Sequence, residues 1–304
     1  MPALVAAVLI RRRQGPAANR VFRVLMSSLR LLVLALLCCL AAPIAAAGDL
    51  RVIYPQPEST QDERLLYPLK ILRLALERSG SEFRLQPSAL RMQQSRSLRE
   101  LADGRELDVV WTTASASREA ALRVIRIPID RGLIGWRVLL IRRGESARFA
   151  AVDSAAALAA LRGVQGHDWP DVSILRSNGL DIATSATYEG LFGMLAHGHV
   201  DYFPRSVTEV TRELEERRGQ PIELEPRLLL RYPSALYFFV NKTNDALAAA
   251  IEEGLRRSIA DGSYAAAFER EYGEVLAALH VRERHVIELA NPHLPALTDP
   301  VPTR

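Results

Sequence analysis

Residues 163–171, GVQGHDWPD, place His167, Asp168 and Trp169 next to one another between a glycine and a proline. A histidine beside a carboxylate can act as a general base, contribute to a metal site, or donate hydrogen bonds to an anion. General-base catalysis needs a nucleophile and an orienting partner that the sequence does not locate, and a metal site needs further ligands at a recognisable spacing. The proline opens a predicted helix, whose free N–H groups favour negative charge. We therefore expect this loop to contact an anionic ligand, with His167 donating. A structural loop in which Asp168 or Asp171 caps the helix, and a catalytic loop, stay as alternatives.

A second group of polar side chains lies where a predicted buried strand, residues 107–113, ends. Arg118 follows this strand in a turn rich in Ser and Thr, and its planar guanidinium matches a carboxylate or a phosphate. Thr112, Thr113 and Ser115 offer hydroxyl groups to the same anion. In the alternative interpretation Arg118 is a surface arginine and the hydroxyl groups only cap the next helix.

Two aromatic residues, Tyr54 and Trp111, lie at the ends of predicted strands. Open α/β sheets bind ligands at strand ends, where an aromatic face can stack on a ligand. Packing in the core is the alternative for both. Trp169 is a third candidate for stacking.

Another arginine, Arg205, follows a predicted strand over residues 200–203. If it faces Arg118 across a cleft, the two guanidinium groups repel each other unless an anion lies between them. The alternative is an exposed arginine that pairs with Glu209, four residues further on.

The elements that must position these residues are short apolar strands alternating with amphipathic helices. The first set has strands at 50–55, 82–87 and 107–113 and helices at 62–80 and 96–104. Such a β-α-β-α-β order is typical of an α/β sheet. The second set has helices at 153–161, 171–178, 187–197 and 206–217 and strands at 181–184 and 200–203, and the chain continues in helices at 244–260 and 263–272.

Two long apolar stretches, within residues 126–145 and 231–242, are predicted to cross between two lobes. Small ligands bind in clefts between lobes, and closure about such a hinge is a common response to a ligand. Gly132 and Gly135 would supply backbone freedom at the first crossing.

The N-terminal residues 1–47 have the features of a secretory signal. Six of the 39 Lys and Arg residues lie there together with no Asp or Glu, so the rest of the chain carries 33 basic against 35 acidic residues. The basic charge therefore belongs to this segment and does not indicate nucleic-acid binding. An apolar run ends in Ala45-Ala46-Ala47, which predicts cleavage before Gly48 and a periplasmic protein; an uncleaved membrane anchor is the alternative.

Both cysteines, Cys38 and Cys39, lie inside this apolar run. The mature protein should therefore have no disulfide bond and no thiolate chemistry. Translation can start at Met1 or at Met26, and the sequence does not decide between them.

Four segments resemble motifs of the extracellular solute-binding proteins of family 3, the amino-acid type of periplasmic binding protein. They are LDVVWTTASASREAALRVIRIPI (107–129), LRGVQGHDWPD (161–171), MLAHGHVDYFPRS (194–206) and LAAAIEEGLRRSIADGSYAAAFEREYG (247–273). The resemblance implies an α/β fold of the two-lobe type II kind with two crossing hinge strands. It places residues 48–137 plus 233–304 in lobe 1 and residues 138–232 in lobe 2.

The resemblance also implies that Arg118 is the anion-binding arginine, with Thr113 and Ser115 in place of the family's threonines. Where the family has an aspartate that takes the ligand's ammonium, this chain has Arg205 and Ser206. Where the second lobe of the family has a threonine, this chain has His167. We therefore expect an anion other than an ordinary α-amino acid, such as a dicarboxylate or an aromatic acid bridging Arg118, His167 and Arg205.

The expected function is a periplasmic solute-binding protein that closes on a small anionic solute. The expected partner is an inner-membrane permease of an ABC transporter or a sensor, and we expect a monomer with no cofactor, no bound metal and no nucleic-acid partner. One alternative is an exported enzyme on the same scaffold, a dehydratase with a cleft carboxylate such as Asp168 as its acid. Another is a sensory module without a transport role. The sequence does not identify the solute.

Overall fold

The computed structural model describes residues 50–58 and 62–293. The predicted signal segment, its cleavage site and both cysteines lie outside these residues. Among the helices of the described part of the chain, none has both the length and the apolar composition that a membrane crossing requires.

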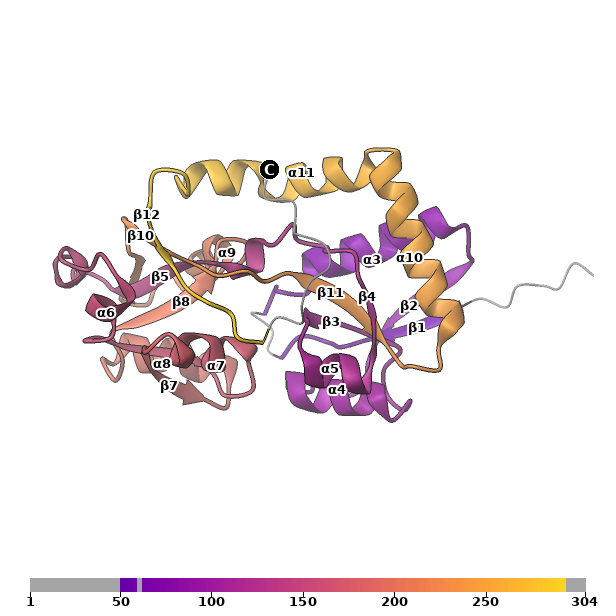
Figure 1. Cartoon of the computed structure of the whole chain (residues 1–304), viewed down its shortest axis with the longest axis horizontal. Helices are drawn as coiled ribbons and strands as arrows, with labels where there is room; N and C mark the ends of the chain where they lie inside the picture. The colour runs from indigo at the N-terminus through magenta and orange to yellow at the C-terminus, as the bar shows by residue number, and fades with distance from the viewer. Residues whose placement is uncertain (1–49, 59–61, 294–304) are drawn as a thin grey trace, which may run out of the picture. The chain divides into compact units, whose positions relative to one another are not determined.

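The first lobe is built on two small sheets. Strands β1 (Leu50–Tyr54) and β2 (Phe83–Pro87) pair in parallel, and β11 (Leu236–Val240) lies between β3 (Val109–Thr113) and β4 (Arg123–Ile125), antiparallel to both. The helices of this lobe are α3 (Leu66–Ser79), α4 (Gln94–Ala102), α5 (Ala116–Ala121), α10 (Asp245–Ala260) and α11 (Ser263–Ala278). Figure 1 shows α4 and α5 on one side of these strands and α3 with α10 on the other.

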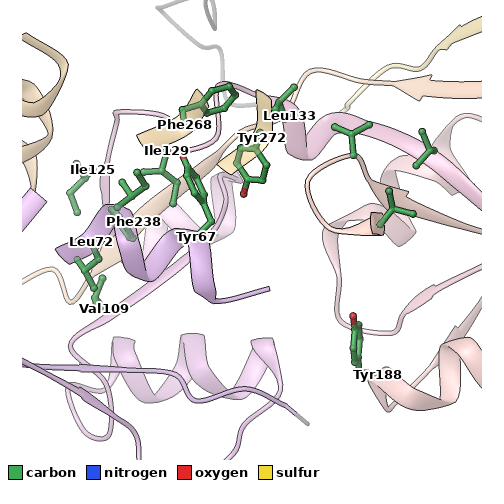
Figure 2. Close-up of a cluster of buried hydrophobic side chains, with 14 of the residues drawn as sticks. Tyr67, Leu72, Val109, Ile125, Ile129, Leu133, Tyr188, Phe238, Phe268 and Tyr272 are labelled. Atoms are coloured by element: carbon green, nitrogen blue, oxygen red, sulfur yellow. The ribbon is translucent and has the colours of Figure 1, made fainter. Parts of the chain in front are cut away.

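Strand periodicity explains why both faces of these strands are covered. Side chains alternate between the two faces of a strand. In β3, Val109 joins the core that includes α3 and α10, whereas its neighbour Val110 joins a separate core beside α4. In β11, Phe238 and Phe239 divide in the same way. Figure 2 shows Leu72, Val109, Ile125 and Phe238 gathered in the first of these cores.

The second lobe contains the larger sheet, in which β5 (Trp136–Arg142) is central. The strand order is β12-β10-β5-β8-β6-β7, with β9 also pairing with β5. The remaining strands are β6 (Arg162–Gly166), β7 (Asp181–Ser185), β8 (Tyr202–Ser206), β9 (Ile222–Leu224), β10 (Leu228–Arg231) and β12 (His285–Glu288), and the helices are α6 (Ala155–Leu158), α7 (Pro170–Ser177), α8 (Tyr188–Ala196) and α9 (Val210–Glu216). The predicted α/β fold of two lobes is confirmed.

The two crossing segments connect β4 to β5 and β10 to β11, and they contact each other. The N–H of Tyr232 donates to the carbonyl of Gly135, and a Cβ atom at Gly135 would lie 2.1 Å from the Tyr232 carbonyl oxygen. Gly135 is therefore required for close approach rather than for the backbone freedom that we expected. Gly132 does adopt a left-handed conformation, with φ of 81°.

The buried carboxylate of Asp130 joins these two crossing segments. It accepts hydrogen bonds from the backbone N–H groups of Gly132, Ile134 and Leu236. Burial raises the pKa of Asp130 to about 6, although the three hydrogen bonds oppose this shift.

Strand β12 departs from the predicted division into lobes, which assigned all of residues 233–304 to lobe 1. It pairs in parallel with β10, at the edge of the sheet of the second lobe. In Figure 1, α11 leads from α10 to β12, so the chain crosses between the lobes a third time. Arg284 holds this last crossing, because its guanidinium donates to the carbonyls of Leu279, Glu225 and Leu228. Four residues, HVIE, carry too little pattern to predict such a strand.

Candidate ligand pocket

A pocket of about 970 Å³, including the space at its open mouth, lies between the two lobes. From the first lobe it is lined by Gln56, Arg64, Gln94, Trp111, Thr112 and Thr113 among others. From the second lobe it is lined by Arg137, Trp169, Asp171, Arg205 and Glu209 among others. A cleft between lobes that combines aromatic and polar groups has the usual form of a small-molecule site.

Arg118 lies directly behind the first-lobe wall of this pocket. Its Nη1 donates to Thr112 Oγ1 at 2.8 Å and to the carbonyl and Oγ1 of Thr113 at 2.8 and 3.1 Å. Its Nη2 donates to Gln94 Oε1 at 2.8 Å. Arg118 is not itself among the lining residues, but these three partners all are.

The charge of Arg118 is not paired with a carboxylate. Within the described part of the chain, no Asp or Glu oxygen lies within 4 Å of its guanidinium, and its side-chain partners are neutral oxygens. Burial lowers the pKa of Arg118 to about 10, while the charges of Asp171 and Asp168 act in the opposite direction. The guanidinium therefore keeps its charge at neutral pH.

The other candidates near β3 have different surroundings. Ser115 caps α5, because its hydroxyl accepts a hydrogen bond from the backbone N–H of Arg118 and forms another with the hydroxyl of Ser117. Ser115 therefore agrees with the alternative interpretation, in which the hydroxyl groups cap the next helix. Trp111 lines the pocket and meets Phe238 edge to face. Tyr54 packs against the core and is not among the residues that line the pocket.

Arg205 lies inside β8 rather than after a strand end, and only 1% of it is exposed. Its Nε donates to Glu213 Oε2 at 2.8 Å, and its Nη2 lies 2.5 Å from Glu213 Oε1 and 2.8 Å from Glu209 Oε2. Burial opposes ionisation of Glu213, but the charge of Arg205 holds the pKa of that carboxyl below its usual value. Two carboxylates therefore neutralise Arg205, so the expected repulsion of an unpaired guanidinium is wrong. The pairing with Glu209 agrees with the alternative, but Arg205 is buried and not exposed, and it still lines the pocket.

Asp171 belongs to a second buried ion pair of the pocket wall. Its Oδ1 lies 2.6 Å from Nη2 of Arg137 and accepts a hydrogen bond from the hydroxyl of Tyr232. Arg137 Nε donates to the same hydroxyl at 2.9 Å. The predicted cap of α7 is absent: its N-cap residue is Trp169, which makes no side-chain capping bond.

The loop of residues 166–169 contributes one side chain to the pocket. Trp169 lines it, with its ring packed on Gly166, where a Cβ atom would meet the ring at 2.5 Å. His167 is exposed, and its backbone N–H donates to Ser185. Asp168 Oδ2 accepts the backbone N–H of Ser95 in the first turn of α4, across the cleft, at 2.8 Å.

The side chain of His167 is exposed, and His167 is not among the residues that line the pocket. The structure therefore does not support the expected contact between His167 and an anion in the pocket. The metal alternative for His167 and Asp168 gains no support either, because no cluster of three or more potential metal-ligating side chains occurs among residues 50–58 and 62–293.

Arg64 is a pocket residue that the sequence analysis missed. Its guanidinium carbon lies 5.1 Å from the ring centre of Trp169 and 4.4 Å from that of Tyr188, both in the second lobe. Arg205 lies 5.0 Å from the same Trp169 ring. No sequence pattern could have found Arg64, because a cation–π contact between residues over a hundred positions apart has no characteristic spacing.

Comparison with known proteins identifies the fold of this chain. No protein-family model matches the chain, and no curated protein matches it. Solved structures do match. An ancestral arginine-binding protein bound to arginine has a TM-score of 0.57 at 15% identity, covering 74% of this chain and 99% of its own. A periplasmic binding protein of Salmonella typhimurium with high arginine specificity has a TM-score of 0.55 at 15% identity, covering 74% and 100%.

A third match is a periplasmic binding protein of the His/Glu/Gln/Arg/opine family from Silicibacter pomeroyi, in complex with lysine. It has a TM-score of 0.55 at 9% identity and covers 74% of this chain and 97% of its own. The chain therefore has the two-lobe fold of the amino-acid-binding periplasmic proteins, which the motif resemblance predicted, at a sequence identity that shows the fold alone.

Proposed function

We propose that this protein is a periplasmic solute-binding protein whose two lobes enclose a small solute, and that Arg118 binds a carboxylate of that solute. The observation that carries the proposal is the unpaired charge of Arg118 beside a pocket between two lobes. A partly buried guanidinium held by neutral oxygens gains most from an anionic ligand, since a charge-assisted hydrogen bond is about twice as strong as a neutral one. An inner-membrane permease or a sensor receives the bound solute.

The other arginines of the pocket are poorer candidates for the ligand. Arg64, Arg137 and Arg205 each lie within 3 Å of a carboxylate oxygen. An incoming carboxylate would have to displace an existing ion pair there. At Arg118 it would have to displace only neutral oxygens, such as the amide oxygen of Gln94.

A solute bridging Arg118, His167 and Arg205 is no longer a sound expectation, because His167 is exposed and Arg205 is neutralised. The expectation against an ordinary α-amino acid needs a new reason, because the pocket wall does contain carboxylates. Asp171 and Glu209 line it, but each lies beside an arginine. A ligand ammonium would have to compete with those arginines for the two carboxylates. We therefore propose a carboxylate solute whose affinity depends little on an ammonium group.

Binding without turnover is the better account of Asp168, the acid of the enzyme alternative. This carboxylate accepts a backbone hydrogen bond from Ser95 and is not among the residues that line the pocket. A general acid must reach the substrate directly or through one water.

A thermal-shift screen tests the proposal, using small carboxylic acids that are each paired with their primary amide. Ligand at a hundred times its dissociation constant adds about 2.7 kcal/mol, or roughly 5–10 °C for a chain of this size. A carboxylate, and not its amide, should shift the wild-type protein. Arg118→Ala should abolish the shift, whereas Arg99→Ala, an exposed arginine of α4, should preserve it. A full melting-temperature shift in Arg118→Ala, or equal shifts of the wild type with acid and amide, would contradict the proposal.

A further inference from the structure

We propose that Arg64 is a built-in occupant of a cation subsite in the pocket, and that it thereby excludes ligands with a guanidinium or ammonium side chain. The inference on ligand choice rests on the proposed function. The subsite itself rests only on the geometry around Arg64.

The first part of the subsite is anionic and comes from the first lobe. Arg64 Nε and Nη2 donate to the two oxygens of Asp62 at 2.7 and 2.8 Å, and Nη2 also donates to Glu58 at 3.0 Å. The side chain of Asp62 is 5% exposed. A two-pronged contact with a buried carboxylate is the arrangement that a free guanidinium ligand would seek.

The second part is aromatic and comes from the second lobe. The rings of Trp169 and Tyr188 have their centres 6.5 Å apart, tilted by 44°, and the guanidinium carbon of Arg64 lies within 5.1 Å of both. Aromatic faces next to a carboxylate form a recognition site for organic cations. In this protein the cation is already supplied by the chain.

The position of Arg64 also matters for a ligand, because Arg64, Asp62 and Trp169 all line the pocket. The side chain of Arg64 is 19% exposed, so the group is reachable from the pocket without unfolding. A ligand cation cannot enter the same space, and it would meet a like charge there. Removing the Arg64 side chain leaves the carboxylate of Asp62 without its bidentate partner and takes one cation from each ring. The guanidinium carbon of Arg205 remains 5.0 Å from the Trp169 ring centre, and that of Arg217 remains 5.2 Å from the Tyr188 ring centre.

Methylguanidinium is the probe that tests the subsite, since it reproduces the end of the missing side chain. At millimolar concentration it should raise the melting temperature of Arg64→Ala by about 5 °C or more and leave the wild type unchanged. Arg64→Lys should not respond, because it keeps a cation in place. Arg73→Ala, an exposed arginine of α3, is the matched control and should behave as the wild type.

A second variant, Arg64→Gln, retains much of the side-chain bulk and serves if Arg64→Ala does not fold; methylguanidinium should stabilise it also. Equal responses of the wild type and both Arg64 variants to methylguanidinium, or no response in any, would overturn the subsite. A response of Arg64→Lys equal to that of Arg64→Ala would overturn the claim that the charge of residue 64 fills it.

The double variant Arg64→Ala, Arg118→Ala separates this inference from the proposed function, since methylguanidinium has no carboxylate. The double variant should respond as Arg64→Ala does, even if the carboxylate role of Arg118 fails. For ligand choice, L-arginine should bind Arg64→Ala at least about tenfold more tightly than the wild type in isothermal titration. Equal affinities would refute the exclusion of cationic ligands while leaving the carboxylate screen unaffected.

Discussion

Asp168 of the second lobe accepts a hydrogen bond from the backbone N–H of Ser95 in the first turn of α4, so one lobe caps a helix of the other. The N-cap residue of α4, Gln93, makes no side-chain capping bond of its own. The contact can form only when the lobes are together. It therefore stabilises the closed form specifically.

We predict that Asp168→Ala weakens ligand binding without any contact to the ligand. A helix cap contributes about 0.5–2 kcal/mol, so the dissociation constant should rise roughly 2- to 30-fold. Isothermal titration with a carboxylate found in the screen measures this, and Asp181→Ala, an exposed carboxylate of β7, is the control. Unchanged affinity in Asp168→Ala would show that the bond does not contribute to closure.

Arg205→Ala should act on stability and not on ligand choice. Removing one partner of a buried ion pair costs about 3–5 kcal/mol, because Glu213 is left buried and unpaired. Urea unfolding without ligand should show this loss, and Arg205→Ala with Glu213→Gln should recover part of it. A stable Arg205→Ala variant with lost ligand binding would instead restore the ligand-contact interpretation.

Two glycines should respond oppositely to alanine. At Gly135 a Cβ atom would lie 2.1 Å from the Tyr232 carbonyl, so the crossing segments must separate, at a cost of about 1–3 kcal/mol. At Gly193 in α8 nothing lies within 4 Å, and alanine should stabilise the protein by about 0.5–1 kcal/mol. Thermal unfolding of both variants distinguishes the two effects, and a neutral Gly135→Ala would show that the crossing segments yield easily.

Asp130 should make the stability of the wild type depend on pH in a way that the stability of Asp130→Asn does not. Its pKa is raised to about 6 in the fold, whereas an unfolded chain ionises near 3.9, so the unfolded state releases the proton first as pH rises. Relative to Asp130→Asn, the wild type should lose up to about 3 kcal/mol of stability between pH 4 and pH 7. Urea unfolding across this range checks it, and a flat difference between the two proteins would contradict the raised pKa.

The sequence predicted those features that depend on local pattern. The apolar run of 107–113 and the Ser/Thr turn after it placed Arg118 next to the pocket, because strand ends and helix starts follow from short-range signals. The sequence could not decide whether Arg205 is unpaired and faces a ligand or is paired with Glu209, because the same residues are compatible with both. The burial of β8 decides it. Arg64 and β12 depend on contacts between distant segments, which no local pattern records.

Among the described residues, the first strand and the last strand belong to opposite lobes. Strand β1 belongs to the first lobe and β12 to the sheet of the second. A donor fluorophore beside β1 and an acceptor beside β12 would therefore travel with different lobes. Hinge closure would then change the energy transfer between the two labels, so the protein already has the layout of a single-chain optical reporter for its solute.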